Sequence, residues 1–189
     1  MANGSPIGDS MPLLIALGAN VVLMRESRGR LVSRELPLEQ LYTGYRQNLM
    51  AKDEVLAWIK VPLPVEGEFL RVYKISKRFE DDISAVCLAM RLHVVGDRIE
   101  SASIGVGGVA ATPVRASKTE AHLRHKTMGS GTFEHAKAVL RAEFEPISDM
   151  RASAAYRREV LGNLLQRFWL ESRGIAHASL ETLSPEDLA

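Results

Sequence analysis

The stretch from residue 69 to residue 95 constrains the fold most, because two strand-like runs there flank a dense charged segment. The first run, residues 69–75, carries the aromatic residues Phe69 and Tyr73 on one face. The second run places large apolar residues at every second position and small residues between them: Val86, Leu88, Met90, Leu92 and Val94, then Ala85, Cys87 and Ala89. A period of two indicates strands that lie on a core. The small-residue face allows another element to approach closely.

The segment between these strands reads Lys77, Arg78, Phe79, Glu80, Asp81 and Asp82. Charged residues on a loop that a rigid sheet holds are often functional groups. A charge run is also typical of a solvated hairpin tip. Both interpretations stay open on the residues alone.

Upstream of this hairpin the chain predicts a smaller unit. A helix over residues 11–17 is expected to begin at a cap, Asp9 or Ser10, and to end at Gly18. Residues 21–24 and 31–36 form a predicted hairpin, a short helix follows over 37–42, and residues 55–61 form a further strand. The prolines at 62 and 64 mark a boundary. The sequence therefore divides into residues 1–66, residues 67–174 and a polar tail, 175–189.

Downstream, a tight turn at Gly96 returns the chain as a strand over residues 99–105. The glycines that follow, Gly105, Gly107 and Gly108, are interpreted as close packing, because no helix begins directly after them. Three helices should follow. A capping box from Ser117 to Glu120 opens a helix that ends by Gly129, Thr132 caps a second, and residues 151–172 form the longest. Strands followed by helices indicate an α+β fold.

The long helix places an apolar stripe at the spacing of one helix face: Tyr156, Val160, Leu161, Leu164, Leu165 and Phe168. The second helix does the same with Phe133, Ala136, Leu140 and Phe144. Trp58 and Trp169 are both interpreted as packing residues.

Composition excludes several classes of function. A net charge of +1 over 189 residues gives no support for a nucleic-acid partner. The single cysteine, Cys87, cannot form an internal disulfide and reads as a buried, inert thiol. The longest apolar stretch, residues 11–24, is interrupted by Pro12 and Gly18 and is too short to span a bilayer. A cytoplasmic protein without a membrane segment is expected.

Searches for chemistry find no nucleophile motif and no phosphate-binding loop. His122 and His125 share a helix face but lack a third ligand, so surface histidines are favoured over a metal site. Neighbouring strand residues such as Asp81 and Asp82 point to opposite faces, which argues against a shared cation. We therefore predict neither a catalytic residue nor a metal ligand in this chain.

Five segments carry a resemblance to the flavoprotein part of molybdenum hydroxylases, and to xanthine dehydrogenases in particular. They are NGSPIGD at residues 3–9, YKISKR and DDISAV within 73–86, GGVAATPVRA at 107–116 and SDMRASAAYR at 148–157. They occur in the family's order and spacing over roughly residues 1–172. The resemblance implies the C-terminal part of a flavin-binding domain, followed by a small antiparallel sheet with a helix bundle.

The resemblance also implies a function. In this family FAD receives electrons from a [2Fe–2S] centre and passes them to NAD, while a molybdenum cofactor on another subunit or domain oxidises the substrate. By position, the resemblance implies four flavin-contact residues: Ser5, Asp9, Leu56 and Lys74. The loop of Phe79, Glu80, Asp81 and Asp82 lies over the flavin ring and shapes NAD access.

For three of these candidates, another interpretation stays open beside the flavin contact. Asp9 can be a helix cap only, Lys74 an exposed strand residue, and Ser5 a turn serine. The family's glycine-rich FAD loops and its iron–sulfur domain are expected on an upstream segment, and the molybdenum site on a large partner subunit. The chain can equally be the flavoprotein of a carbon monoxide or aldehyde-type hydroxylase, or an assembly fragment without bound FAD.

Overall fold

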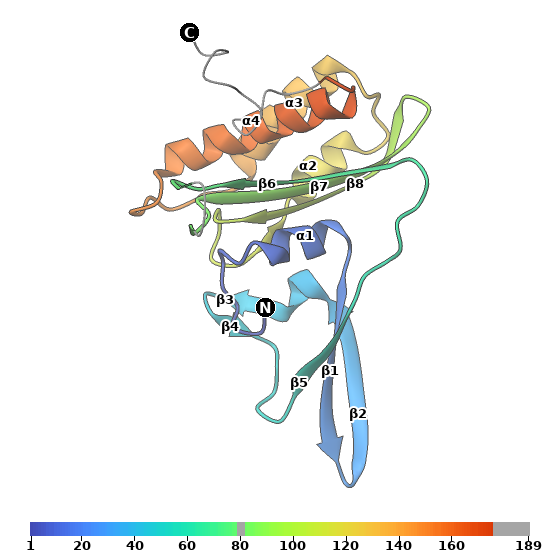
Figure 1. Ribbon diagram of the computed structural model, residues 1–189, viewed down its shortest axis with the longest axis vertical. Coiled ribbons are helices and arrows are strands. Elements are labelled where there is room, and N and C mark those ends of the chain that lie inside the picture. The colour runs from blue at the N-terminus through green and yellow to red at the C-terminus, as the bar shows by residue number, and fades with distance from the viewer. Residues whose placement is uncertain (79–81, 176–189) are drawn as a thin grey trace.

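The computed structural model describes residues 1–78 and 82–175. Phe79, Glu80 and Asp81, three members of the predicted loop over the flavin ring, lie outside these ranges, as does most of the polar tail. The described part is an α+β structure, as the sequence predicts, with helices and antiparallel sheets arranged around two apolar cores (Figure 1).

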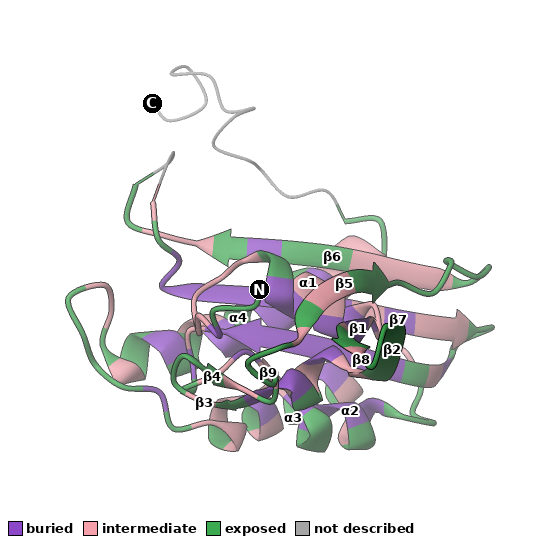
Figure 2. Ribbon diagram, turned by 90° about the horizontal axis from the view of Figure 1, so that it is seen from below, coloured by how far each residue is buried: buried purple, intermediate pink, exposed green. Residues whose placement is uncertain are grey.

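The predicted hairpin forms the centre of the larger sheet, whose strand order is β6-β7-β8-β9. Its strands are β6 (Glu68–Ile75), β7 (Val86–Val95), β8 (Arg98–Gly107) and the short β9 (Val114–Arg115). β6 pairs antiparallel with β7 from Glu68 opposite His93 to Ile75 opposite Val86. Figure 2 shows β7 mostly buried and the edge strand β6 mostly exposed or half-buried, which fits the apolar alternation of β7.

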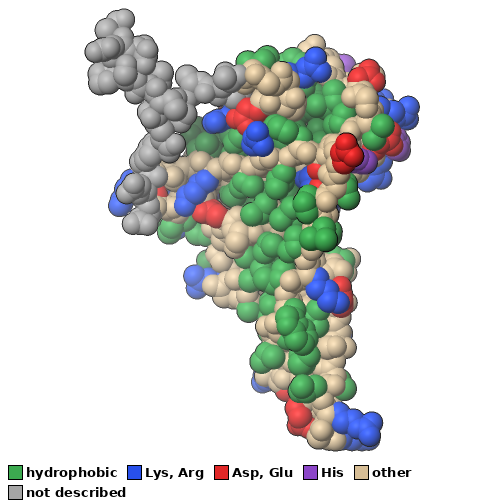
Figure 3. Space-filling model, turned by 45° about the vertical axis from the view of Figure 1, so that its right-hand side comes forward, with side chains coloured by type: hydrophobic (Ala, Val, Ile, Leu, Met, Phe, Trp, Pro, Cys, Tyr) green, Lys and Arg blue, Asp and Glu red, His purple; other side chains and the backbone are tan. Residues whose placement is uncertain are grey.

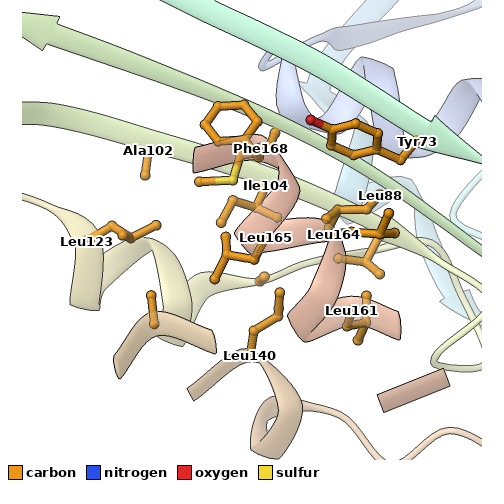
Figure 4. Packing of buried hydrophobic residues seen from close by; sticks show 14 of the residues in the cluster. Tyr73, Leu88, Ala102, Ile104, Leu123, Leu140, Leu161, Leu164, Leu165 and Phe168 are labelled. Carbon is orange, nitrogen blue, oxygen red and sulfur yellow. The ribbon is translucent and has the colours of Figure 1, made fainter. Parts of the chain in front are cut away.

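Three helices cover one face of this sheet: α2 (Ser117–Leu123), α3 (Ser130–Glu143) and α4 (Ala154–Ser172) (Figure 1). The large apolar residues of β7 face them, as the alternation predicts. Figure 4 shows Leu88 and Ile104 of the sheet meeting Leu164 and Leu165 of α4. The stripe on α4 is confirmed for Leu161, Leu164, Leu165 and Phe168, which are buried. Val160 is only partly buried, and Tyr156 is 49% exposed.

The other face of the sheet receives α1 (Ser10–Ala16), which packs on β7 and β8 (Figure 1). Here the sequence prediction of close packing at the glycines is confirmed. A Cβ atom on Gly105 would collide with the backbone of Pro12, and one on Gly107 would lie 3.1 Å from the Pro12 ring. Small residues on β7 and β8 thus let a helix backbone rest directly on the sheet.

The smaller sheet has the strand order β2-β1-β5, formed by β1 (Asn20–Ser27), β2 (Arg30–Pro37) and β5 (Val55–Lys60). A short 3₁₀ helix, η1 (Leu38–Leu41), and a two-stranded ribbon of β3 (Tyr42–Gly44) and β4 (Gln47–Asn48) complete this region. The sequence pattern does not indicate this ribbon, whose strands are only three and two residues long. The core of this region contains Met11, Ile15, Val21, Leu23, Leu38, Leu41 and Tyr42.

Two predicted helix caps are wrong, and the third, Asp9, has the predicted position but makes no capping bond. The N-cap position of α1 is Asp9, but its carboxylate makes no capping bond and turns toward the sheet instead. α2 begins after Ala116, and Glu120, the expected capping-box partner, accepts a hydrogen bond from the β8 amide of Ile104 at 2.7 Å. α3 begins at Ser130, so Thr132 lies inside it.

The boundaries of two helices also differ from the prediction. The longest helix begins at Ala154 rather than 151, because Ser153 caps it and accepts a hydrogen bond from the Tyr156 amide at 3.1 Å. α2 ends at Leu123, well before Gly129. No helix in the described ranges is both long and apolar enough to cross a membrane.

Candidate functional site

The carboxylate of Asp9 joins the two parts of the molecule. It stands at the start of α1, next to the connected end of the β6–β7 hairpin. One oxygen lies 2.9 Å from Lys74 Nζ on β6, and the other accepts a hydrogen bond from Ser84, just before β7. Two residues 65 positions apart in the sequence, Asp9 and Lys74, are thus brought together as an ion pair.

This ion pair affects the groups around it. The hydrogen bond with Asp9 raises the pKa of Lys74, so Lys74 is a firmly protonated, half-exposed cation. Cys87, opposite Lys74 in the sheet, lies beneath the pair and donates to the Asp9 carbonyl oxygen at 3.7 Å. Burial raises the pKa of the Cys87 thiol to about 12, and the Asp9 charge adds to the effect. The prediction of an inert, buried thiol is confirmed.

The loop before Asp9 carries Ser5. The hydroxyl of Ser5 accepts from the Ile7 amide at 3.5 Å, as a turn serine does. The loop is attached to the sheet because the Gly108 amide donates to the Pro6 carbonyl at 3.0 Å. Gly108 has φ +82°, and a Cβ atom there would collide with the Ala85 carbonyl. Only glycine allows this close approach of the three backbone segments.

Arg157, the fourth residue of α4, fastens the same segments from the opposite side. Its side chain is 2% exposed. It donates to the Gly108 carbonyl at 2.7 Å, to the Ala85 carbonyl, and to Asp149 Oδ1 at 2.7 Å. A single guanidinium therefore holds the end of β8, the start of β7 and the turn that precedes α4.

Asp149 in turn organises that turn. It accepts hydrogen bonds from the Arg151 and Ala152 amides at 2.8 and 3.2 Å. Burial opposes ionisation of this carboxyl, but these amides and Arg157 outweigh it and lower the pKa of Asp149. The turn is thereby set in one conformation next to the Ser5 loop.

A cavity of about 290 Å³ opens between the Ser5 loop and this turn. Its wall combines the Ser5 hydroxyl, the Tyr45 ring, the cations Arg46 and Arg151, and apolar side chains such as Ile147. Hydroxyl, aromatic and guanidinium groups are suited to a nucleotide that carries a ring system and phosphates. The volume lies at the lower end of the range for ligand pockets, so these residues fit one part of FAD rather than the whole molecule.

A second cavity, of about 490 Å³, lies on the other side of Arg151, between the β6–β7 connection and the turn at 148–153. Lys77 bridges its mouth by donating to the Met150 carbonyl at 2.6 Å. Asp82, the one described member of the predicted flavin loop, accepts from the Arg78 and Ile83 amides at 2.8 Å each. Those hydrogen bonds, chiefly the one from Arg78, lower the pKa of Asp82. Its carboxylate shapes the loop itself.

The structure brings only some of the sequence-predicted site residues together. Asp9 and Lys74 touch, and Ser5 belongs to the same loop as Asp9 but faces the 290 Å³ cavity. Leu56 lies on β5 and packs, half-buried, on the smaller core. Its predicted role as a flavin contact stays a prediction, as do the roles of Ser5, Asp9 and Lys74.

Three residues of the junction were missed: Ser84, Asp149 and Arg157. The last two lie in the SDMRASAAYR segment that carries the family resemblance, which was the available signal. Nothing in the local pattern assigns them a partner, because Arg157 reaches acceptors 49 and 72 residues away in the sequence. The expectation that His122 and His125 share a helix face is wrong, because α2 ends at Leu123 and His125 lies beyond it. Among the described residues, no group of three or more His, Cys, Asp and Glu side chains could hold a metal ion.

Comparison with known proteins identifies both parts of this arrangement. Residues 1–64 match the family of FAD binding domains in molybdopterin dehydrogenase, and residues 71–172 match the CO dehydrogenase flavoprotein C-terminal domain. A chain of the reconstituted CO dehydrogenase from Oligotropha carboxidovorans superposes with a TM-score of 0.82 at 28% identity, over 93% of this chain and 59% of that one.

Two curated relatives come from Emericella nidulans. Nicotinate hydroxylase hnxS is 33% identical over 89% of this chain, and xanthine dehydrogenase is 31% identical over 89% of it. The chain spans only 13% and 12% of the length of these proteins. The fold and the two matched segments define an FAD-binding flavoprotein of the molybdenum hydroxylase class. The chain belongs to the CO dehydrogenase flavoprotein C-terminal domain family, which confirms the resemblance seen in the sequence.

Proposed function

We propose that this chain is the FAD-binding, electron-transferring portion of a xanthine dehydrogenase, which accepts electrons from a [2Fe–2S] centre and delivers them through FAD to NAD during purine hydroxylation in the cytoplasm. The observation that carries the proposal is the Asp9–Lys74 ion pair. It links the segment matched to FAD-binding domains with the segment matched to the flavoprotein C-terminal domain. A molybdenum-binding large subunit and an upstream iron–sulfur and FAD-loop segment complete the enzyme.

The proposed roles of the segments divide at the sequence boundaries 1–66, 67–174 and 175–189. The first part supplies Ser5 and Asp9 toward the cofactor, and Leu56 through its strand. The second supplies Lys74 and the loop of residues 79–82, which controls NAD access. FAD, when bound, provides the conversion between single-electron and two-electron transfer.

The roles of the residues follow from their charges and contacts. Lys74 keeps one face of its ammonium group half-exposed while Asp9 neutralises the other, so it can donate a hydrogen bond to an electron-rich ligand atom. Ser84 fixes the Asp9 rotamer. Arg157 and Asp149 also line the 290 Å³ cavity, and their hydrogen bonds within the protein hold the loops in position.

The second candidate is the flavoprotein of a carbon monoxide or aldehyde-type hydroxylase. The similarity in structure to the CO dehydrogenase chain, at a TM-score of 0.82, favours it. An assembly fragment without FAD is the non-enzymatic alternative. A measurement can distinguish these three candidate functions, because only the xanthine dehydrogenase reduces NAD with xanthine.

The test uses the chain assembled with its partner subunits. We expect bound FAD in the visible spectrum and xanthine-dependent reduction of NAD. Lys74→Met should lower the FAD content or slow NAD reduction at least tenfold, while a dye that accepts electrons at the molybdenum subunit is reduced at the normal rate. Lys52→Met, on an exposed turn, is the matched control.

Three outcomes distinguish the candidates. Carbon monoxide or an aldehyde as the electron source, with xanthine inert, selects the second candidate. An assembly that carries no flavin selects the non-enzymatic one. Normal FAD content and NAD reduction in Lys74→Met would contradict the role given to Lys74.

A further inference from the structure

Helix α1 connects the region of the smaller sheet to the larger sheet. It touches η1 on one side and β7, β8 and β9 on the other. Figure 3 shows the smaller sheet projecting from the rest of the molecule, with apolar side chains along it and charged side chains at its tip. Trp58 on this sheet is 56% exposed, so the prediction that Trp58 is a packing residue is wrong. The attachment of the projecting sheet therefore depends on α1, η1 and the groups that hold them.

The two ends of α1 are held by different groups. At its start, the Asp9 carboxylate contacts Lys74 and Ser84. At its end, the Ile15 carbonyl accepts a hydrogen bond from Arg115 Nη2 at 2.9 Å. Between these ends, the helix backbone rests on the glycines of β8, which leave no room for a Cβ atom. The seven residues of α1 thus form a supported rod about 10 Å long, so a displacement at one end is passed to the other.

Arg115 contacts four elements with one guanidinium group. Its Nε donates to Glu39 of η1 at 2.8 Å, and its Nη1 donates to Ser103 of β8 at 2.8 Å and to Glu120 of α2 at 3.1 Å. Its Nη2 binds the Ile15 carbonyl of α1. A planar fork of five N–H donors reaches all of these acceptors at once, which a single ammonium group cannot do.

The two carboxylates of this cluster share Arg115 as their ionic partner. Burial raises the pKa of Glu120, although the Ile104 amide and Arg115 oppose this effect. Burial also opposes the charge of Arg115, but Glu120 and Glu39 outweigh it and raise the pKa of Arg115. Among the described residues, Glu39 Oε2 is buried and has no hydrogen-bond partner. Removing the guanidinium would therefore leave two acidic groups together where η1, α1 and α2 meet.

We propose that Arg115 is a positioning residue for the candidate flavin site: by holding the end of α1, it sets the place of the Asp9 carboxylate beside Lys74. The inference rests on the proposed function, which gives the Asp9–Lys74 pair its role toward the cofactor. Arg115 itself lies at the opposite end of the helix and needs no contact with a ligand.

The physical consequence of losing Arg115 follows from these contacts. The Ile15 carbonyl would lose its donor, and repulsion between Glu39 and Glu120 would push η1 away from α2. Because α1 is a rigid rod between the two ends, its start would shift on the sheet. Asp9 would then neutralise Lys74 less completely, which changes the charge presented to an electron-rich ligand.

Cys87 provides a direct measurement of this shift. It is the single cysteine of the chain, it is buried, and its thiol donates to the Asp9 carbonyl at 3.7 Å. A thiol reagent such as dithiobis(nitrobenzoic acid) reaches Cys87 only when the start of α1 lifts from the sheet or the whole protein unfolds. In native buffer, Arg115→Met should accelerate this labelling at least about tenfold, and urea denaturation of the same samples measures the global contribution.

Arg34→Met is the matched control. Arg34 is also an arginine with several bonds, to both oxygens of Glu54 and to the Leu49 carbonyl, but it does not contact α1. It should leave the labelling rate of Cys87 within about twofold of wild type. Equal acceleration by the two substitutions, or none by Arg115→Met, overturns the proposal. If Arg115→Met does not fold, Arg115→Lys, which keeps the charge and loses the fork, should accelerate labelling at least about threefold.

The chain assembled with its partner subunits tests the effect on the candidate site. Arg115→Met should slow NAD reduction at least about fivefold, with dye reduction at the molybdenum subunit unchanged. In a Lys74→Met background the same substitution should change NAD reduction less than about twofold, because the pair that Arg115 positions is already broken. Independent effects of distant residues add, so equal effects in both backgrounds would show a role in stability alone and overturn the proposal.

The two measurements separate the two hypotheses. An assembly without FAD counts against the proposed function, whereas accelerated Cys87 labelling in Arg115→Met would still show that Arg115 positions Asp9. An assembly that binds FAD and reduces NAD, but whose Cys87 labelling does not depend on Arg115, keeps the proposed function and overturns this inference.

Discussion

At the scale of single residues, Arg157 is among the largest fully buried side chains that the structure describes. It is almost fully buried, yet its guanidinium finds two carbonyls and one carboxylate. A buried charge is tolerated only when it is paired and hydrogen-bonded. Removing it would leave the buried carbonyls of Ala85 and Gly108 without this donor and would take one of several donors from Asp149.

Arg157→Leu should therefore lower the free energy of unfolding by about 3–5 kcal/mol. Urea denaturation measures this directly. Arg158→Leu, the exposed neighbour on the same helix turn, should change it by less than about 0.5 kcal/mol. Equal effects of the two substitutions would show that the contacts of Arg157 contribute little.

Glu54 gives a prediction about pH. Its carboxylate accepts both Arg34 Nε at 2.7 Å and Arg34 Nη2 at 2.8 Å, and also the Ala51 amide at 2.8 Å. These bonds, with Arg34 first, lower the pKa of Glu54 to about 2. The unfolded chain binds this proton near pH 4.3, so the stabilisation is complete above that pH and is lost as pH falls toward 2.

The measurement compares wild type with Glu54→Gln by denaturant unfolding between pH 6 and the lowest pH at which the fold survives. The difference in unfolding free energy should be constant above about pH 5 and should shrink steadily below it. A difference that does not change with pH would contradict the lowered pKa of Glu54.

At the scale of elements, α4 tests the packing of the larger core. Leu164 is 5% exposed and meets the sheet, while Asn163 beside it points to solvent. Leu164→Asp would bury a carboxylate without a partner and should cost several kcal/mol, which is a large part of a domain's stability.

Asn163→Asp introduces the same carboxylate one position away, close to Arg141, whose Nη2 already donates to Asn163 at 3.4 Å. We expect its melting temperature to match that of wild type within a few degrees. Thermal denaturation followed by circular dichroism compares the two. Similar melting of both variants would mean that the register of α4 on the sheet is incorrect.

Elements defined by periodicity could be predicted from the sequence, and those defined by distant contacts could not. The alternation of Val86, Leu88 and Met90 is local information and gives the correct strand and face. The start of α2 is different: its Lys118 and Thr119 amides donate to Glu143 of α3 at 2.7 and 3.0 Å. Glu143 lies more than 20 residues away, so no local capping pattern contains it.

The candidate site follows the same rule. Asp9 and Lys74 were found through the family resemblance, and their contact was invisible to any pattern of spacing. Asp9 in particular reads as a cap because it precedes a helix, but an ammonium ion at 2.9 Å and the Ser84 hydroxyl compete for its oxygens. A charge-assisted pair outweighs a single capping bond to an amide.

At the scale of the whole molecule, the proposed function makes the described chain one wall of a flavin site. The cavity beside Ser5 is about 290 Å³, and we expect its cations, Arg46 and Arg151, to provide two point contacts for phosphate. FAD should bind the isolated chain weakly, because a loop or helix end rich in backbone amides would be needed to enclose a pyrophosphate.

Isothermal titration calorimetry of the isolated chain with FAD measures this. We expect a dissociation constant well above micromolar, which corresponds to a binding free energy weaker than about −8 kcal/mol. Submicromolar binding would contradict the expectation and would indicate a self-sufficient site. Titration with riboflavin, which lacks the phosphates, provides the control for the contribution of Arg46 and Arg151.

The packing of α1 on the larger sheet has a consequence for the order in which the protein folds. Arg115 Nη2 donates to the Ile15 carbonyl at 2.9 Å, and the two residues are 100 positions apart. A ribosome adds roughly 5–20 residues per second, so about 5–20 s pass between the synthesis of α1 and that of its partner strands. During that interval Met11 and Ile15 can pack on the smaller core, whose other residues lie between 21 and 42. The contact of Pro12 with Gly105 and Gly107 of β8 must wait until that strand is synthesised, so the docking of α1 on the larger sheet is limited by translation.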